Sequence, residues 1–240
     1  MNSNDILKIE NLYMKYKKKD KNYVLEDLNF SIKKGSFHAF IGENGAGKST
    51  TIKIIAGLNN DYDGNVIING LNVKENIEAR KSFSYVPDKI VFPGGINTWE
   101  YIYNTALLVR NDKEGLKVEL NNLLKKFEIE EIVNRNPNKL SSGQIKKVLL
   151  ILAVLEKSKF IILDEPASFL DPTSRFFLFS ELERMNKEGI TIMISSHILE
   201  EIKKYVDSVT FIKKGKIIWS GKVKGQELIK KYNEHILGDR

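Results

Sequence analysis

The stretch "FIGENGAGKST", from Phe40 to Thr50, decides the fold of this chain. It overlaps the apolar run "FHAFI" at Phe37–Ile41, which is typical of a strand that is covered on both faces. From Lys48 the pattern "KSTTIKIIAGL" places apolar residues at helical spacing until Gly57 ends it. The glycine-rich part is therefore predicted to be a strand-to-helix turn.

Three glycines lie on this turn, Gly42, Gly45 and Gly47, where glycine allows positive φ and lets backbone N–H groups approach a ligand closely. Gly42 and Gly47, with Lys48 and Ser49, fit G-x-x-x-x-G-K-[ST], a loop that surrounds phosphates with N–H donors at a helix N-terminus. Lys48 would reach the β- and γ-phosphates of a nucleoside triphosphate, and Ser49 would bind Mg²⁺. The residues expected to contact the nucleotide here are Gly42, Asn44, Gly45, Ala46, Gly47, Lys48, Ser49 and Thr50.

Length and composition indicate an ordinary globular protein. The chain has 240 residues, of which 42% are hydrophobic and 29% charged. Its longest apolar run, Val148–Leu155, is far too short to cross a bilayer, and the N-terminal residues contain no apolar signal region. The sequence has no cysteine, which excludes thiol catalysis and thiolate metal sites. We therefore expect a soluble, cytosolic protein.

The net charge of +7 includes a lysine cluster at Lys15–Lys21. A basic surface can meet nucleic acid, anionic lipid or phosphates. The cluster lacks the interleaved aromatic residues that bind single strands. We favour a solvated lysine face, and we expect no nucleic acid partner.

The first part of the chain predicts a β-rich region next to the glycine-rich turn. Short strand-like pieces separated by turns fill residues 6–41, and another piece follows at 64–70. Residues 98–144 instead contain two amphipathic helices with no strand between them. We predict a helical subdomain at about 96–157, inserted in the α/β core of a single domain over residues 1–240.

The later part of the chain returns to the α/β pattern. The segments "SKFIILDEP" at 158–166 and "GITIMISSH" at 189–197 are typical of buried parallel strands, each followed by a helix. A hairpin turning at Lys214–Gly215 and a polar helix close the chain. The predicted fold is α/β, a nucleotide-binding P-loop core with an antiparallel β subdomain and an inserted helical subdomain.

Two carboxylates end the strand Phe160–Leu163. Asp164, at the strand tip beside the phosphate loop, can hold Mg²⁺ through water. Glu165 can orient and polarise the attacking water. The alternative is a polar strand end near a turn, which Pro166 would favour.

The segment "LSSGQ" at Leu140–Gln144 opens a further helical run. Ser141 is a good N-cap, so the segment can be a capped helix start and nothing more. A helix N-terminus with small residues is also an anion site. One triphosphate does not need two such sites in one chain, unless the second serves the nucleotide of a neighbouring subunit.

Taken in order, "GENGAGKST", "LSSGQ", "IILDEP", "SFLD" and His197 resemble the ATP-binding subunit of an ATP-binding cassette (ABC) transporter. The resemblance covers the chain from about Ile6 to Gly221. It implies ATP and Mg²⁺ as ligands and a head-to-tail pair of ATPase subunits. Ser141, Gly143 and Gln144 of one subunit would then contact the γ-phosphate held by the other. A P-loop kinase or GTPase gives no reason for "LSSGQ".

The resemblance also assigns roles to single residues. It makes Glu165 the catalytic base and His197 a contact to the γ-phosphate, both acting with Lys48. Asp171 in "SFLD" would link the two sites across the dimer. Tyr16 would stack on adenine, with Tyr13 as the alternative.

Two positions depart from the family pattern. Ser142 stands where the usual "LSGGQ" has its first glycine, and it would be strained if that backbone needs positive φ. Asp88 in "YVPD" stands where many members have glutamine. Its carboxylate can bind Mg²⁺ and contact the nucleotide, but it cannot donate a hydrogen bond. With an acidic residue at this position the chain resembles subfamilies that export drugs, peptides or ions.

The resulting prediction is an ATPase that drives transport, most simply export, through a separate integral membrane permease. The protein would be cytoplasmic and peripheral at the inner face of the cell membrane. Its second ATPase subunit would be an identical or a different chain. The alternative is an ABC ATPase that acts on cytosolic machinery such as iron–sulfur assembly.

Overall fold

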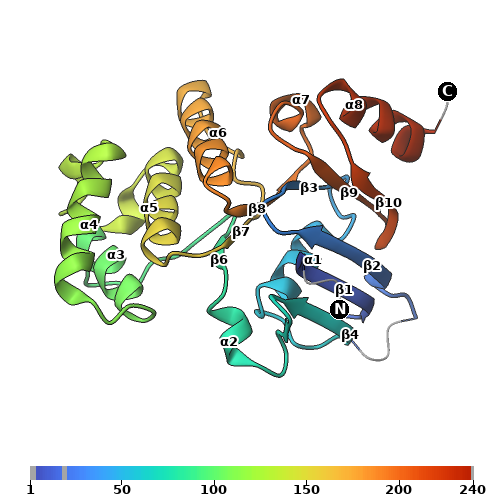
Figure 1. Cartoon of the computed structure of the whole chain (residues 1–240), viewed down its shortest axis with the longest axis horizontal. Coiled ribbons are helices and arrows are strands. Elements are labelled where there is room, and N and C mark those ends of the chain that lie inside the picture. The colour runs from blue at the N-terminus through green and yellow to red at the C-terminus, as the bar shows by residue number, and fades with distance from the viewer. Residues whose placement is uncertain (1–3, 18–20, 239–240) are drawn as a thin grey trace.

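The computed structural model describes residues 4–17 and 21–238. A six-stranded sheet at its centre has the order β10-β9-β3-β8-β7-β6 (Figure 1). Neighbouring strands are parallel except β9 and β10, which form an antiparallel hairpin. The strands are β3 (Phe37–Ile41), β6 (Ser84–Val86), β7 (Phe160–Leu163), β8 (Thr191–Ser196), β9 (Ser208–Lys213) and β10 (Lys216–Lys222).

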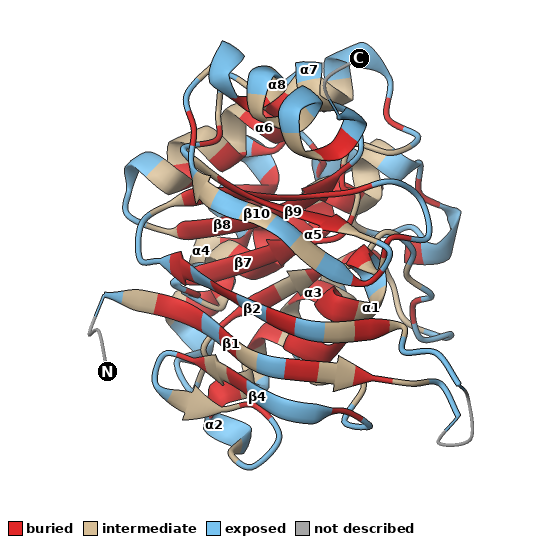
Figure 2. Cartoon of the chain, turned by 90° about the vertical axis from the view of Figure 1, so that its right-hand side faces the viewer, coloured by how far each residue is buried: buried red, intermediate tan, exposed pale blue. Residues whose placement is uncertain are grey.

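A second, antiparallel sheet has the order β2-β1-β4-β5. Along β2 buried and exposed residues alternate, because one face of the sheet packs on the core and the other meets solvent (Figure 2). Helix α1 (Lys48–Ile55) shares one buried cluster with residues of both sheets and so lies between them. The strands are β1 (Asp5–Met14), β2 (Leu25–Lys33), β4 (Asp63–Ile68) and β5 (Leu71–Asn72).

Three helices form a lobe at one end of the molecule, at the left of Figure 1. They are α3 (Thr98–Leu107), α4 (Lys113–Lys126) and α5 (Ser142–Leu155), with 3₁₀ turns at Glu130–Ile132 and Pro137–Lys139 between α4 and α5. Their apolar faces share a second buried cluster with the other face of the central sheet. The predicted helices are found here, whereas the division of the chain into subdomains stays a prediction.

The remaining helices lie outside this lobe. Figure 1 shows α6 beside the core and α7 and α8 near the C-terminus. Their bounds are α2 (Ile77–Arg80), α6 (Pro172–Lys187), α7 (Leu199–Ile202) and α8 (Gln226–Tyr232), and a π-helical turn follows at Asn233–Leu237. Within residues 4–17 and 21–238, no helix is both long and apolar enough to span a membrane.

Most strand predictions are confirmed. All five residues of β3 are buried, and β7 and β8 are parallel neighbours whose residues are buried along their whole length. Sequence reasoning missed β6, because three residues are too few to show a period. Helix α1 ends at Ile55, and Gly57 follows with a φ of +69°.

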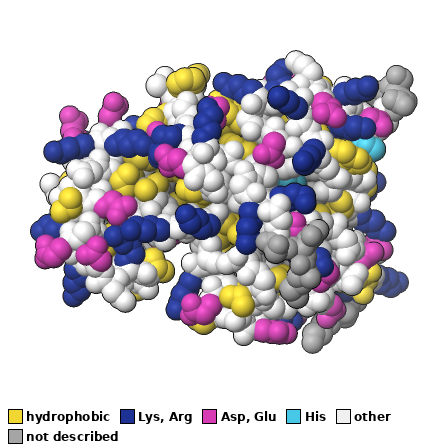
Figure 3. All heavy atoms as spheres, viewed as in Figure 1, with side chains coloured by type: hydrophobic (Ala, Val, Ile, Leu, Met, Phe, Trp, Pro, Cys, Tyr) yellow, Lys and Arg dark blue, Asp and Glu magenta, His cyan; other side chains and the backbone are white. Residues whose placement is uncertain are grey.

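Basic side chains are spread over the molecule. On the face drawn in Figure 3, Lys and Arg side chains cover the helical lobe and the core, with Asp and Glu among them. The lysine cluster at Lys15–Lys21 includes residues 18–20, which lie outside the described residues. On the face shown, positive charge is therefore distributed rather than gathered into one stripe.

Candidate active site

The phosphate loop needs its glycines for two different reasons. Gly45 and Gly47 have φ of +80° and +111°, in the region that favours glycine, as predicted. Gly42 is not among the glycines with positive φ. A Cβ at Gly42 would lie 2.4 Å from the carbonyl oxygen of Ile212 in β9, so this glycine is required by close packing between the loop and the sheet.

Lys48 is the first residue of α1, and only 5% of it is exposed. Its Nζ donates to the carbonyl oxygens of Gly42 (2.7 Å) and Glu43 (3.3 Å) and lies 3.2 Å from Oε1 of Glu165. Three contacts thus fix the ammonium group at the base of the loop. The N-terminus of α1 has no side-chain cap, so its N–H groups and its dipole suit an anion.

Asp164 lies buried at the end of β7, where its carboxylate meets two hydroxyls. Ser195 Oγ donates to Asp164 Oδ1 at 2.7 Å, and Ser49 Oγ approaches the same oxygen at 3.3 Å. Burial raises the pKa of Asp164, and these two hydrogen bonds oppose the rise. Sequence reasoning missed Ser195, whose only signal was its place on β8, two residues before His197.

Glu165 follows with a φ of +43°, an uncommon conformation for a residue with a side chain. Its backbone N–H donates to Ser195 Oγ at 2.8 Å, and Nδ1 of His197 donates to its Oε2 at 2.9 Å. The carboxylate therefore lies between the Lys48 ammonium and the His197 ring. A carboxylate held in this way can accept a proton from a water at the mouth of the loop.

Lys48, Glu165 and His197 line an open cleft of about 560 Å³. Tyr16, which is 66% exposed, lies on its rim, with its hydroxyl 3.0 Å from that of Thr50. Tyr13 instead packs edge-to-face on Tyr23, at 5.3 Å between ring centres, in a separate depression. Of the two tyrosines considered for adenine, only Tyr16 lines the cleft.

Asp88 also lines the cleft, from the loop after β6. Nζ of Lys146 donates to the carbonyl oxygen of Pro87 at 2.7 Å and fixes this loop against α5. Burial lowers the pKa of Lys146, while the charges of Asp88 and Asp164 oppose that change. The loop is thus tied to the helical lobe on one side and faces the nucleotide cleft on the other.

The oxygen donors of the cleft fit a hard divalent cation. Ser49, Asp164 and Asp88 offer the hydroxyl and carboxylate oxygens that Mg²⁺ prefers. Among the described residues, no three or more His, Cys, Asp or Glu side chains form a group that could hold a metal ion. Ser49, Asp164 and Asp88 would supply only part of the ligands of such a cation, and phosphate and water would supply the rest.

The "LSSGQ" segment lies apart from this cleft. Ser141 and Gln144 form a capping box at the start of α5, and a Cβ at Gly143 would be 2.6 Å from Ser174 Oγ. Ser174 Oγ in turn donates to Asp171 Oδ2 at 2.6 Å, and Asp171 caps α6. In the described part of the chain, Gly143 and Asp171 are thus near each other, and neither lines the cleft.

Ser142 does not carry the strain that a positive φ would impose. It is the first residue of α5 and is not among the residues with positive φ. Serine is well tolerated in the first turn of a helix. The departure from "LSGGQ" is therefore tolerated by the backbone.

The family model described as "ABC transporter" matches residues 25–168. A putative ABC transporter ATP-binding protein of Mycoplasma pneumoniae is 38% identical over 225 residues, covering 93% of this chain and 69% of that protein. The chain belongs to the ABC transporter family. The lantibiotic transport ATP-binding protein SrtF of Streptococcus pyogenes is 32% identical over 236 residues, covering 98% of this chain and 99% of that protein.

The solved structures agree with the ABC transporter assignment. A structure of an ATP binding subunit of an ABC transporter is 29% identical, with a TM-score of 0.84, over 96% of this chain and 95% of that chain. The predicted resemblance, the P-loop α/β fold and the class of ATPase are confirmed. The relatives are transporter ATP-binding proteins and give no support to the alternative, an ATPase of cytosolic machinery.

Proposed function

We propose that this ABC ATPase hydrolyses ATP at a site completed by a second ATPase subunit. One observation carries the proposal: the "LSSGQ" helix start lies outside the nucleotide cleft of its own chain. Phe169 at the cleft rim and Phe176 on α6 are 81% and 67% exposed, on either side of Asp171 in sequence. A partner presenting its own "LSSGQ" segment to the cleft would cover this apolar surface.

Within the site we assign Glu165 as the general base. It takes a proton from the water that attacks the γ-phosphorus, and the bond to the bridging oxygen breaks to leave ADP and phosphate. Lys48 and His197 would face the γ-phosphate, where charge builds up during the reaction. Tyr16 would stack on the adenine.

Mg²⁺ would be held by Ser49 and by Asp164 and Asp88, directly or through water. When bound, the cation neutralises charge on the β- and γ-phosphates. Burial of Asp164 favours this role, because a desolvated carboxylate is stabilised by a nearby cation.

We further propose that hydrolysis drives export through a separate membrane permease. The support is the chain's full-length similarity to a lantibiotic transport ATP-binding protein. The protein would then lie at the inner face of the cell membrane. Its second ATPase subunit is an identical chain or a different one.

The first experiment replaces the base. Glu165→Gln should keep Mg·ATP binding and slow hydrolysis by on the order of 10²-fold. ATP-bound dimers should then accumulate, as measured by light scattering after size exclusion. Glu114→Gln, at an exposed glutamate on α4 outside the cleft, is the control and should hydrolyse ATP normally. Near-normal turnover of Glu165→Gln would remove Glu165 from this role.

A second experiment tests the shared site. Gly143→Asp should bind ATP as a monomer but neither dimerise nor hydrolyse, because its carboxylate would face the γ-phosphate. Lys48→Ala should fail earlier, at ATP binding. If identical subunits share sites, mixing the two inactive variants should restore activity, since a mixed dimer has one intact composite site. Full activity of Gly143→Asp alone would rule out sharing.

A further inference from the structure

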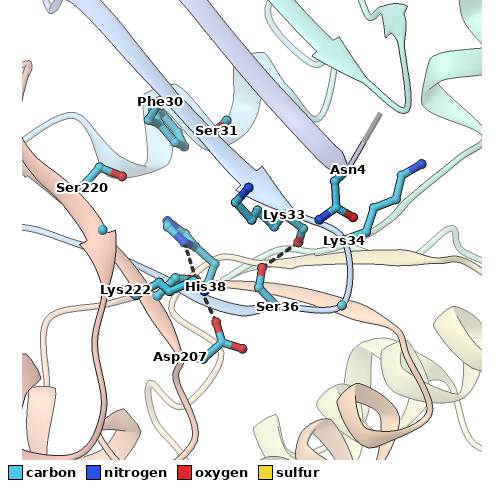
Figure 4. A pocket seen from close by; sticks show the side chains of 13 residues that line it. Asn4, Phe30, Ser31, Lys33, Lys34, Ser36, His38, Asp207, Ser220 and Lys222 are labelled. Carbon is cyan, nitrogen blue, oxygen red and sulfur yellow. Dashed lines mark hydrogen bonds between the residues drawn. The ribbon is translucent and has the colours of Figure 1, made fainter. Parts of the chain in front are cut away.

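A second cavity of about 560 Å³ lies at the opposite end of β3 from the phosphate loop (Figure 4). It opens where the edge strand β2 of the antiparallel sheet meets the edge strand β10 of the central sheet. His38 on β3 and Ser208 on β9 also line it. The ATPase mechanism uses none of these residues.

His38 forms the floor of this cavity and is 1% exposed. Burial lowers its pKa to about 3, so the ring is neutral at physiological pH. Nδ1 lies 3.0 Å from Ser208 Oγ, and Nε2 lies 3.0 Å from Thr210 Oγ1. The ring of Phe30 stacks on it at 6.4 Å and 10°.

Asp207 fixes the direction of each hydrogen bond in the series that links Ser208, His38, Thr210 and Ser220. Its carboxylate can only accept, so the Ser208 hydroxyl donates to it (2.9 Å) and must accept from His38 Nδ1–H. Nε2 therefore accepts from Thr210, and Thr210 accepts from Ser220, whose Oγ is 2.8 Å away. Ser220 is exposed at the cavity mouth. Because its hydroxyl donates to Thr210, it can only accept a hydrogen bond from a ligand in the cavity.

The mouth of the cavity is positively charged. The side chains of Lys33 and Lys222 flank His38, and Lys34 extends to the outer edge beside Asn4 (Figure 4). None of the three lysines forms an ion pair with a described residue. Among the described residues that line the cavity, Asp207 is the only acidic one, and its oxygens already accept from Phe37 N–H (3.0 Å) and Ser208.

We propose that this cavity binds a small phosphate-bearing ligand. The ammonium groups of Lys33 and Lys222 hold the phosphate, and a hydroxyl on or next to it donates to Ser220. Lysine suits phosphate as a point charge, and the volume is that of a small-molecule site. The proposal is independent of ATP hydrolysis, because the site shares no residue with the nucleotide cleft.

The three histidines of the chain allow a direct test. His38 reports on the cavity, His197 on the nucleotide cleft and His235 on the C-terminal helix. Inorganic phosphate is titrated while heteronuclear NMR follows the imidazole nitrogens. A saturable shift of His38 is expected, and it should persist in Lys48→Ala, which weakens the nucleotide cleft only. A His38 signal that does not move, or moves only together with His197, overturns the proposal.

Matched variants test each contact. Lys222→Gln should weaken phosphate binding roughly tenfold, whereas Lys216→Gln, on the same strand but outside the cavity, should not. Sulfate, which has no hydroxyl to donate to Ser220, should bind more weakly than phosphate, and Ser220→Ala should remove that preference. Equal losses in both lysine variants would mean unspecific charge screening. Succinate binding as tightly as phosphate would refute the assignment to phosphate.

Discussion

Replacing Ser195 by alanine should lower the stability of the protein and slow ATP hydrolysis, because the Ser195 hydroxyl contacts two residues of the active site. The Ser195 hydroxyl donates to Asp164 Oδ1 at 2.7 Å and accepts from the backbone N–H of Glu165 at 2.8 Å. The side chain is fully buried, so no water replaces it. One hydroxyl thus positions both the carboxylate assigned to Mg²⁺ and the assigned base.

The expected cost follows from these two bonds. A hydrogen bond to a charged group contributes about 1.5–3 kcal/mol, and a buried N–H left unpaired costs about 1–3 kcal/mol. Since both effects arise in one variant, Ser195→Ala should lower the free energy of unfolding by about 2.5–6 kcal/mol. Glu165 would also lose the bond that holds its left-handed backbone, so hydrolysis should slow.

The neighbouring Ser196 is a matched control. Its hydroxyl accepts a single bond, from Ile198 N–H at 3.0 Å, so Ser196→Ala should cost only about 1 kcal/mol. Denaturant unfolding and steady-state ATPase rates of the two variants give the comparison. If Ser195→Ala is no worse than Ser196→Ala in both measurements, the positioning role is refuted.

The pH dependence gives a further check on Ser195. Burial raises the pKa of Asp164 in the folded state, so its charged form destabilises the fold as pH rises through that value. The hydrogen bond from Ser195 opposes this rise in the pKa of Asp164. Ser195→Ala removes the bond and should therefore raise the pKa further. The stability difference between wild type and Ser195→Ala should therefore narrow as pH falls and Asp164 becomes protonated.

Three other predictions concern single side chains. Asp88→Asn should make ATP affinity less dependent on Mg²⁺, because the carboxylate repels phosphates that lack the cation; parallel titration curves would exclude a metal-sensing role. Tyr16→Ala should weaken ATP binding about tenfold through lost stacking, whereas Tyr13→Ala should not; equal affinities would exclude Tyr16. His38 binds no proton in the folded state between its ordinary pKa of 6.5 and its folded pKa of about 3, so wild type should lose about 1.4 kcal/mol of stability per pH unit on acidification. In His38→Gln this pH-dependent loss of stability should be absent. Equal slopes of the free energy of unfolding against pH in wild type and His38→Gln would contradict the prediction.

The sequence by itself determined the elements whose signals are local. The buried strand β3, the helix from Lys48 and the strand just before Asp164 follow from apolar periodicity and turn residues within short windows. The phosphate loop is equally local, because its N–H donors and Lys48 come from one continuous segment. For this reason these short motifs are enough to indicate the family.

Tertiary structure alone decided the contacts between distant segments. Ser195 and Asp164 are 31 residues apart and meet only because β7 and β8 are neighbours in the sheet. Gly42 is required by the carbonyl of Ile212, and His38 gains its cavity only where β2 and β10 meet. Strand order depends on the packing of the whole core, so no short window of sequence specifies which side chains it brings together.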